Sequence, residues 1–353
     1  MSIVANKNRI ISDLALPTLR IVAPILLALV AGGLILILLG KDPFSYYWYV
    51  VKRGLLSWSG LQATLVRTAP LMFVAAGLIV AFRAGIWNLG VDGQFLLAAV
   101  IVAAVAPSLN QYIPNWTMFV GAFVIAGVVG GAWSVIPAYL KASHGINEII
   151  TTLMMTFLGI SLANVLVKIP FNDPSTTVPQ TVTLPVEERL PRLFDTIIHQ
   201  GVLFGVVAVL GVHFLMTRTA FGLRLQVVGA NPKAAVHAGL NVRILTYFAF
   251  GLSAALAGMG GAVEILGVWG TVRADWNPAY GLLVVPLVFL ARFHGFGTIA
   301  FVLFFAVLMI GGESASRRLG VPTFFVLVLV GLLLMFLAIV EYLDHRWRQT
   351  RKT

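Results

Sequence analysis

Long apolar runs separated by short polar segments dominate the sequence. The first run covers residues 21–40, and comparable runs follow as far as residue 343. An α-helix needs about 20 predominantly apolar residues to cross the hydrocarbon core of a bilayer, where only internal hydrogen bonds can satisfy its backbone. The runs predict about ten such helices, the shortest being 279–291, which contains Pro286. The pattern therefore predicts an all-α, polytopic integral membrane protein in which residues 1–353 form one transmembrane domain.

Composition agrees with this class and excludes several others. Of the 353 residues, 59% are hydrophobic and 10% charged, whereas a soluble chain has about 25% charged residues. The net charge of +11 fits the Lys- and Arg-rich cytoplasmic loops of membrane proteins, so no nucleic-acid partner is expected. There is no cysteine, no histidine pattern with metal-ligand spacing and no nucleophile–base set, which predicts neither a metal site nor a catalytic residue. There is also no GxxxxGK[ST] motif, so the chain is not expected to bind ATP itself.

The distribution of basic residues orients the predicted helices. Lys and Arg concentrate at the two chain ends and in the segment 217–243, and such residues favour the cytoplasmic side. We therefore expect both termini and this loop in the cytoplasm. Residues 169–196 then form a loop on the opposite, periplasmic face, and their five prolines predict an irregular conformation. Residues 41–60 are interpreted as a second outer loop.

A short helix is predicted inside the basic loop. Asn231 suits the N-cap, Pro232 the first helical position and Gly239 the left-handed residue after the last turn. A helix of two turns is marginal in water, so it needs another surface to rest on. We interpret it as a docking element through which a separate motor subunit moves the membrane part. Its other candidate contact residues are Lys233, Ala234, Ala235 and His237.

Residues 82–94, FRAGIWNLGVDGQ, join two predicted spans and are poor in helix formers. Their three glycines favour irregular backbone, which is tolerated at membrane depth only where protein or water covers it. Asn88, Asp92 and Gln94 are therefore candidates for lining the transport path or its inner gate. The alternative is a tight turn whose polar groups cap the next helix.

The stretch HGINEIITT, residues 144–152, opens the predicted span 147–168. Asn147 suits the N-cap, and Glu148 lies in the first turn, where the helix dipole favours a negative charge. The structural interpretation is a helix start. The functional interpretation is that Asn147, Glu148 and Thr151 form part of a cytoplasmic gate.

Two charged residues fall inside predicted spans. Arg67 and Glu264 lie at similar depths, and ionisable groups in a membrane usually face a cavity or each other. We expect them to form a pair, or one of them to bind solute; the alternative is that both reach the interface through their long side chains. The span 244–267 is also rich in Gly, Ala and Ser, which predicts close helix packing.

Three of these stretches carry a family resemblance. FRAGIWNLGVDGQ, GINEIITT and LRLQVVGANPKAAVHAGLNV occur in this order, and together they resemble the permease subunits of bacterial ABC importers of the branched-chain amino acid, ribose and nucleoside group. The resemblance extends from about Leu61 to Tyr342. The run Thr64–Leu71, continuing into FRAG, is most similar to the nucleoside and simple-sugar permeases of the group.

The resemblance implies a set of partners in the bacterial inner membrane. These are a second, homologous permease, a cytoplasmic ATPase with two nucleotide-binding cassettes, a periplasmic or lipoprotein solute-binding protein, and membrane lipid. ATP and Mg would bind to the ATPase, and no cofactor to this chain. The spacing of Ala234, Ala235 and Gly239 resembles the EAAxxxG loop by which importer permeases contact their ATPases. Lys233 stands where that pattern has Glu, so the charge at this contact is reversed.

The solute implied by the resemblance is small and polar, in the first place a nucleoside. A simple sugar such as ribose and a branched-chain amino acid are the alternatives within the same architecture. An ion-coupled secondary transporter is a further alternative, but it would need coupling carboxylates near the middle of the membrane. The predicted spans contain none at that depth.

Overall fold

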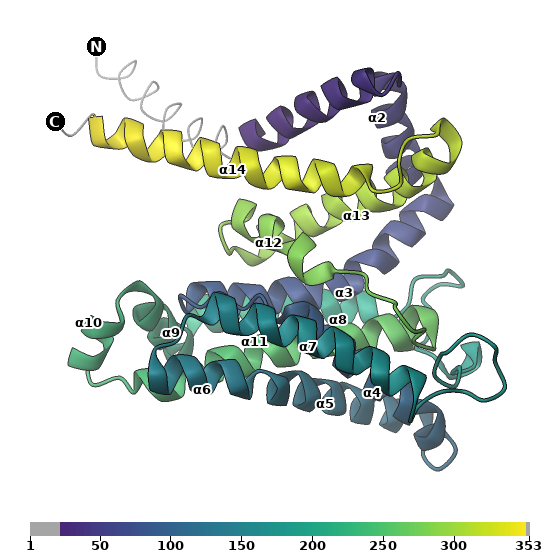
Figure 1. The fold of residues 1–353 in the computed structure, drawn as a ribbon, viewed down its shortest axis with the longest axis horizontal. Coiled ribbons are helices and arrows are strands. Elements are labelled where there is room, and N and C mark those ends of the chain that lie inside the picture. The colour runs from purple at the N-terminus through teal and green to yellow at the C-terminus, as the bar shows by residue number, and fades with distance from the viewer. Residues whose placement is uncertain (1–21, 351–353) are drawn as a thin grey trace. The chain divides into compact units, whose positions relative to one another are not determined.

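The computed structural model describes residues 22–350, which form an all-helical membrane protein (Figure 1). Eight helices of this part of the chain are long and apolar enough to cross a membrane, which confirms the predicted multi-pass, all-α class. The termini, predicted to be cytoplasmic, lie outside the described residues. The eight spans are α3 (Trp58–Arg83), α4 (Val91–Asn110), α5 continued by α6 (Asn115–Trp133 and Val135–His144), α7 (Glu148–Lys168), α8 (Gly201–Arg218), α11 continued by η3 (Val242–Glu264 and Ile265–Trp269), α13 (Gly295–Leu319) and α14 (Phe325–Thr350).

The remaining helices are shorter. Three of them are apolar, and one of these corresponds to the predicted short span 279–291. The π-helical turns η1 and η3 extend neighbouring helices. The shorter elements are Val22–Leu38, α2 (Pro43–Val51), η1 (Lys52–Leu56), η2 (Val186–Glu188), α9 (Ala220–Ala230), α10 (Pro232–His237) and α12 (Tyr280–Leu290).

The chain divides into two compact units, and the first combines residues 1–61 with 307–353. In its described part, the helix Val22–Leu38, α2 and the chain from 307 onward share an apolar core in which Tyr46 and Phe325 meet edge to face, with ring centroids 5.2 Å apart. Residues 41–60, expected to be a loop, are largely helical, because Asp42 caps the amide of Phe44 at 3.1 Å and Pro43 occupies the first helical position.

The second unit, residues 62–306, is built around α11. This helix packs against α4 and α5 at backbone distance. A β-carbon built on Gly258 would lie 2.3 Å from the carbonyl oxygen of Ala126, and one on Gly261 would lie 2.3 Å from that of Phe95. Apolar burial gives helices little reason to associate in lipid, so small residues that allow such close approach supply the packing. The predicted tight packing of 244–267 is confirmed.

The two ends of the second unit differ. Helices α9 and α10 lie together at the end where α3 finishes and α4 begins (Figure 1). The segment 169–200 lies at the other end and is irregular apart from η2, as its prolines predict. It is held to the chain that follows α11, since the Thr181 amide donates to the Val272 carbonyl at 3.0 Å and the Leu184 amide to the Gly270 carbonyl at 2.8 Å.

Candidate functional site

The irregular backbone between α3 and α4 carries a buried polar network. The Asn88 side chain is fully buried, and its amide nitrogen donates to Gln94 Oε1 at 3.1 Å and to Ser253 Oγ at 3.0 Å. Gln94 Nε2 donates back to Asn88 Oδ1 at 3.2 Å. A buried network of satisfied polar groups fixes one conformation, because breaking one of its hydrogen bonds would leave a buried polar group without a partner, which is energetically unfavourable. The network therefore holds the break between α3 and α4 against α11.

Helix α7 bonds to the other side of the same break. The hydroxyl of Thr152 accepts from the Leu89 amide at 3.2 Å, and the hydroxyl of Thr156 donates to the Leu89 carbonyl at 2.8 Å. These two residues are absent from the predicted site. Their spacing of four residues places them on one helix face, which is the sequence signal that could have indicated them.

A cavity of about 230 Å³ lies between this break, α7 and α12. The Asp92 carboxylate accepts from the Gly281 amide at 2.6 Å and so joins the start of α4 to the start of α12. Most of the lining is apolar, and because the Asn88 amide is used in the buried network, the Asp92 carboxylate and the Thr156 hydroxyl are the polar groups that could orient a small solute. The lining residues are Asn88, Leu89, Val91, Asp92, Leu153, Thr156, Phe157, Ile160, Gly281, Leu282 and Val285.

The predicted pathway residues thus divide into two groups. Asn88 and Asp92 line the cavity, and Gln94 bonds to Asn88. The three residues at the start of α7 lie outside the cavity lining and are used locally. Asn147 Oδ1 caps the Ile149 amide at 2.9 Å, and the Thr151 hydroxyl donates to the Glu148 carbonyl at 3.2 Å.

The Glu148 carboxylate has a basic partner on the preceding helix. Its Oε2 accepts from Lys141 Nζ at 2.7 Å, and the glutamate side chain is only 9% exposed. This ion pair joins the end of α6 to the start of α7 across the turn that contains Gly145, whose φ of +65° lies in the left-handed region. A charge pair at such a junction can hold or release two helices relative to each other.

Arg67 and Glu264, predicted to face each other, do so. Arg67 Nη1 lies 3.6 Å from Glu264 Oε1, and the glutamate side chain is 2% exposed, so it does not extend to the interface. Two further residues complete the cluster: Tyr280, which bonds to both charged groups, and Trp269, whose indole nitrogen donates to Glu264 Oε1 at 3.0 Å. Neither was predicted, because the sequence shows no relationship between α12, η3 and Arg67.

Helix α10 has the predicted limits. Asn231 Oδ1 accepts from the amides of Lys233 and Ala234 at 3.0 and 3.1 Å, Pro232 occupies the first position, and Gly239 follows with a φ of +76°. Ala235 is fully buried and anchors the helix. The other α10 residues, Pro232, Lys233, Ala234, Val236 and His237, are exposed. The helix thus presents an exposed surface, available for contact, at one end of the unit.

Helix α9, which was not predicted, connects this contact surface to the break. It is capped by Thr219, whose hydroxyl accepts from the Gly222 amide at 3.1 Å. Its last turn carries Gly229, which packs directly on the backbone of Ala84 and Gly85. Helix α9 therefore links α10 to the backbone that precedes the cavity lining.

A multi-pass helical bundle with a small internal cavity and an exposed capped helix at one end is the arrangement expected of a membrane permease. Residues 60–338 match the family described as branched-chain amino acid transport system / permease component. The chain belongs to this family, as the resemblance of its three motifs predicts. It is a permease subunit of an ABC transporter, and therefore a transport component rather than an enzyme.

Three similar proteins that match most of the chain are named for a sugar or for nucleosides. The glucose ABC transporter permease protein TsgB13 of Haloferax volcanii is 34% identical over 91% of this chain and 87% of its own length. The guanosine ABC transporter permease protein NupP of Bacillus subtilis is 25% identical over 93% of this chain and 94% of its own length. The nucleoside ABC transporter permease protein NupB of Lactococcus lactis is 25% identical over 95% and 92%, respectively.

Proposed function

We propose that this chain is the permease subunit of an importer that moves a nucleoside across the bacterial inner membrane. The observation that carries the proposal is the cavity bordered by Asn88, Asp92 and Thr156 between apolar walls. A nucleobase has two flat apolar faces and a polar edge, and it can lie between aliphatic and aromatic side chains while a few polar groups bind that edge. The guanosine and nucleoside permeases that match nearly the whole chain support this assignment.

A simple sugar is the second candidate. The 34% identical relative is a glucose permease, and this observation favours a sugar over an amino acid. Both solutes carry sugar hydroxyl groups, but only the nucleoside adds a base with two flat apolar faces that can lie against the mainly apolar lining. The composition of the cavity therefore favours the nucleoside.

The energy for import would come from a partner. In this proposal α10 docks on a cytoplasmic ATPase with two nucleotide-binding cassettes, which binds ATP and Mg, while a solute-binding protein delivers the solute from outside. A second permease would pack beside this one and close the open side of the cavity, where Phe157 and Leu282 are 61% and 63% exposed. ATP binding shifts the balance between inward- and outward-facing states only if the two states differ in affinity for ATP.

Two charged clusters are proposed as gates. Arg67 and Glu264, with Tyr280, would hold one end of the second unit closed. The Lys141–Glu148 pair, with Asn147 and Thr151, would hold the junction of α6 and α7 at the other end. Each cluster joins separate helices, so breaking one pair while the other stays intact would open the pathway to one side only.

The test is transport by the reconstituted complete assembly: both permeases, ATPase and solute-binding protein. Uptake of labelled guanosine and of labelled glucose into proteoliposomes is measured with ATP inside the liposomes, with ATP outside them and without ATP. Nucleoside uptake that requires ATP, and is reduced by Asp92→Asn and Thr156→Val, supports the proposal. Asp275→Asn is the control, because this aspartate is exposed and does not line the cavity. ATP-independent flux that follows an ion gradient would overturn the importer assignment, and uptake of glucose alone would overturn the nucleoside.

A further inference from the structure

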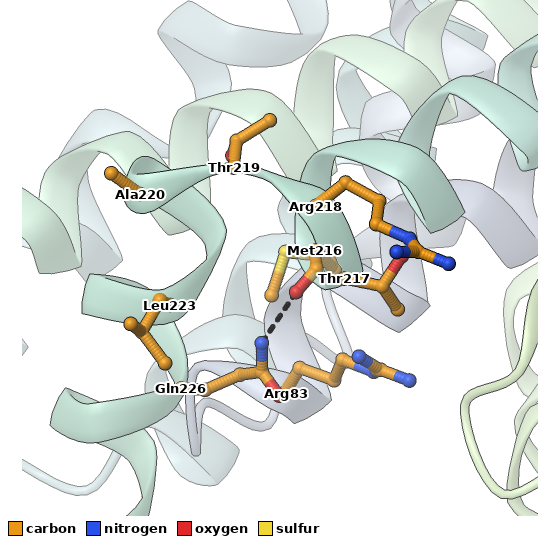
Figure 2. Close-up of a pocket in the computed structure, with 8 residues that line it drawn as sticks. All are labelled: Arg83, Met216, Thr217, Arg218, Thr219, Ala220, Leu223 and Gln226. Atoms are coloured by element: carbon orange, nitrogen blue, oxygen red, sulfur yellow. Dashed lines mark hydrogen bonds between the residues drawn. The ribbon is translucent and has the colours of Figure 1, made fainter.

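A second and larger cavity, of about 630 Å³, lies where α3, α8 and α9 meet (Figure 2). The end of α3 and the end of α8 each contribute an arginine, and the first turn of α9 forms the opposite wall. Figure 2 shows the guanidinium groups of Arg83 and Arg218 extending to the same side, with Ala220 and Leu223 across from them. The lining residues are Arg83, Met216, Thr217, Arg218, Thr219, Ala220, Leu223 and Gln226.

The charge of this cavity is uniformly positive. Its lining contains two arginines and no carboxylate, and in the described part of the chain neither arginine forms an ion pair. Arg83 Nη2 donates to the Phe293 carbonyl at 3.0 Å, which positions the guanidinium and leaves its other donors for a ligand. The rings of His213 and His294 lie beside this group with centroids 4.4 Å apart. Two like charges held at one cavity without a counterion indicate an anion site.

The geometry favours phosphate among anions. Arginine presents planar pairs of N–H donors that match phosphate oxygens, and two such groups from different helices can bind one phosphate together. The wall formed by the first turn of α9 adds the positive end of a helix of 11 residues. The Gln226 side chain, which also lines the cavity, is fixed toward α8 by its bond to the Met216 carbonyl (Figure 2).

The surroundings indicate the source of the phosphate. Large apolar side chains next to the cavity are exposed: Leu223 and Phe214 are each 62% exposed, and Phe296 is 61% exposed. These residues belong to α9, α8 and α13 of the second unit, and α8 and α13 are membrane spans. A basic pocket bordered by lipid-facing apolar side chains at the end of spans suits a phospholipid, whose headgroup enters the pocket while its acyl chains lie along the helices.

We propose that the Arg83–Arg218 cavity binds a phosphate group, and that an anionic phospholipid headgroup is its source. The site lies on α9, the helix that joins α10 to the break between α3 and α4. A bound headgroup would neutralise the two arginines and hold the ends of α3, α8 and α9 together. The lipid would thereby set the stiffness of the connection between the docking helix and the cavity at Asn88 and Asp92.

Native mass spectrometry of the full-length chain tests the proposal. The detergent-purified protein is stripped of lipid and titrated with phosphatidylglycerol, with phosphatidylcholine and, separately, with inorganic phosphate. We expect one phosphatidylglycerol to be retained under activation that removes phosphatidylcholine. Loss of either arginine, in Arg83→Gln or Arg218→Gln, should weaken retention about fivefold, the effect of one basic residue near an acidic lipid.

Arg224→Gln is the matched control, because Arg224 is an exposed arginine of α9 that does not line the cavity. Unchanged retention in this variant, with loss in Arg218→Gln, supports the site. Equal loss in both variants would show general surface attraction and overturn it. Retention of inorganic phosphate without the lipid overturns the lipid source. If Arg218→Gln retains the lipid but no longer co-purifies with the ATPase, the arginines bind an acidic partner chain and the proposal is wrong.

Discussion

Gly229 of α9 lies directly against Gly85 in the break between α3 and α4. A β-carbon built on Gly229 would lie 2.7 Å from the Gly85 amide nitrogen, and one built on Gly85 would lie 2.8 Å from the Gly229 α-carbon. Real β-carbons are not found this close to a backbone, so both positions require glycine for the observed packing. Gly85 also has a φ of +69°, which other residues adopt at a cost. This contact therefore packs α9, the helix before α10, directly on the backbone that precedes the cavity lining at Asn88.

Substitution at this contact should separate them. We expect Gly229→Ala to destabilise the protein by about 1–3 kcal/mol, since the added methyl group must displace backbone rather than a flexible side chain. The measurement is the thermal unfolding midpoint in detergent, together with ATP-dependent uptake by the assembly. Gly211→Ala in α8 is the control, because no atom lies within 4 Å of its added β-carbon. A Gly229→Ala protein as stable and active as the control variant would contradict the rigid connection.

The Arg67–Glu264 pair provides a second prediction. Removing one member of a buried pair leaves the other charge without compensation, at a typical cost of about 3–5 kcal/mol. Arg67→Ala should therefore lower the unfolding midpoint strongly, because Glu264 is only 2% exposed. The double variant Arg67→Ala/Glu264→Ala should recover part of this loss. The measurement is a double-mutant cycle of unfolding midpoints.

An exposed ion pair in the same unit is the control for that cycle. Lys168 Nζ lies 3.2 Å from Asp275 Oδ2, with the two side chains 44% and 75% exposed. Exposed pairs contribute about 0–1 kcal/mol, so Lys168→Ala should have little effect on the midpoint. If Arg67→Ala and Lys168→Ala have equally small effects, the Arg67–Glu264 cluster does not hold its helices together.

The sequence predicts the start of α10 and the glycine that follows it because their determinants are local. Asn231, Pro232 and Gly239 act within one or two turns, and each has a specific backbone preference that other contacts did not override. The pairing of Arg67 with Glu264 was predictable for a different reason: a charge in a membrane needs a partner, and the chain offers few. Both inferences rest on strong constraints that involve few residues.

The unpredicted parts of the site depend on contacts between distant segments. In the sequence, Tyr280 and Trp269 are aromatic residues within apolar surroundings and belong to no motif. Only the placement of α12 and η3 brings them to Glu264. Helix α4 begins only at Val91 because Asn88, through its bonds to Gln94 and Ser253, holds an irregular backbone before it. Hydropathy indicates which residues can lie in the membrane, but it does not indicate which of their side chains contact one another in the folded protein.

His199 supplies a pH-dependent prediction. Its ring is fully buried just before the start of α8 in the sequence, and its Nδ1 accepts a hydrogen bond from the Gly201 amide at 3.2 Å. Burial and, as the smaller cause, the positive charge of Arg192 together lower the pKa of His199 to about 4. The unfolded chain has the ordinary pKa of about 6.5, so between these values it binds more protons than the folded chain. Stability should therefore fall as pH decreases from about 6.5 towards 4.

The expected size of this effect is about 2 kcal/mol between pH 7 and pH 5, the result of a lowered histidine pKa over that range. His199→Asn should remove it, because an asparagine carbonyl can accept from the Gly201 amide and does not titrate. Unfolding midpoints of both proteins at the two pH values give the comparison. A wild-type protein whose midpoint falls no further at pH 5 than that of His199→Asn would show that His199 is not buried in its neutral form.

A substitution at the N-cap of α10 tests whether the ATPase binds this element as a formed helix. Asn231→Ala removes the acceptor of the Lys233 and Ala234 amides, and loss of such a cap costs about 1 kcal/mol. In a helix of six residues this should unfold the element, so we expect co-purification with the ATPase to weaken while the unfolding midpoint of the membrane bundle stays the same. Asn241→Ala is the matched control, since Asn241 Oδ1 caps the Ile244 amide at 3.1 Å at the start of the 23-residue α11, which has packing to hold it. Equal ATPase binding by Asn231→Ala and Asn241→Ala would mean that the partner does not recognise α10 as a formed helix, and the route from α10 through Gly229 to Gly85 would lose its role in transport.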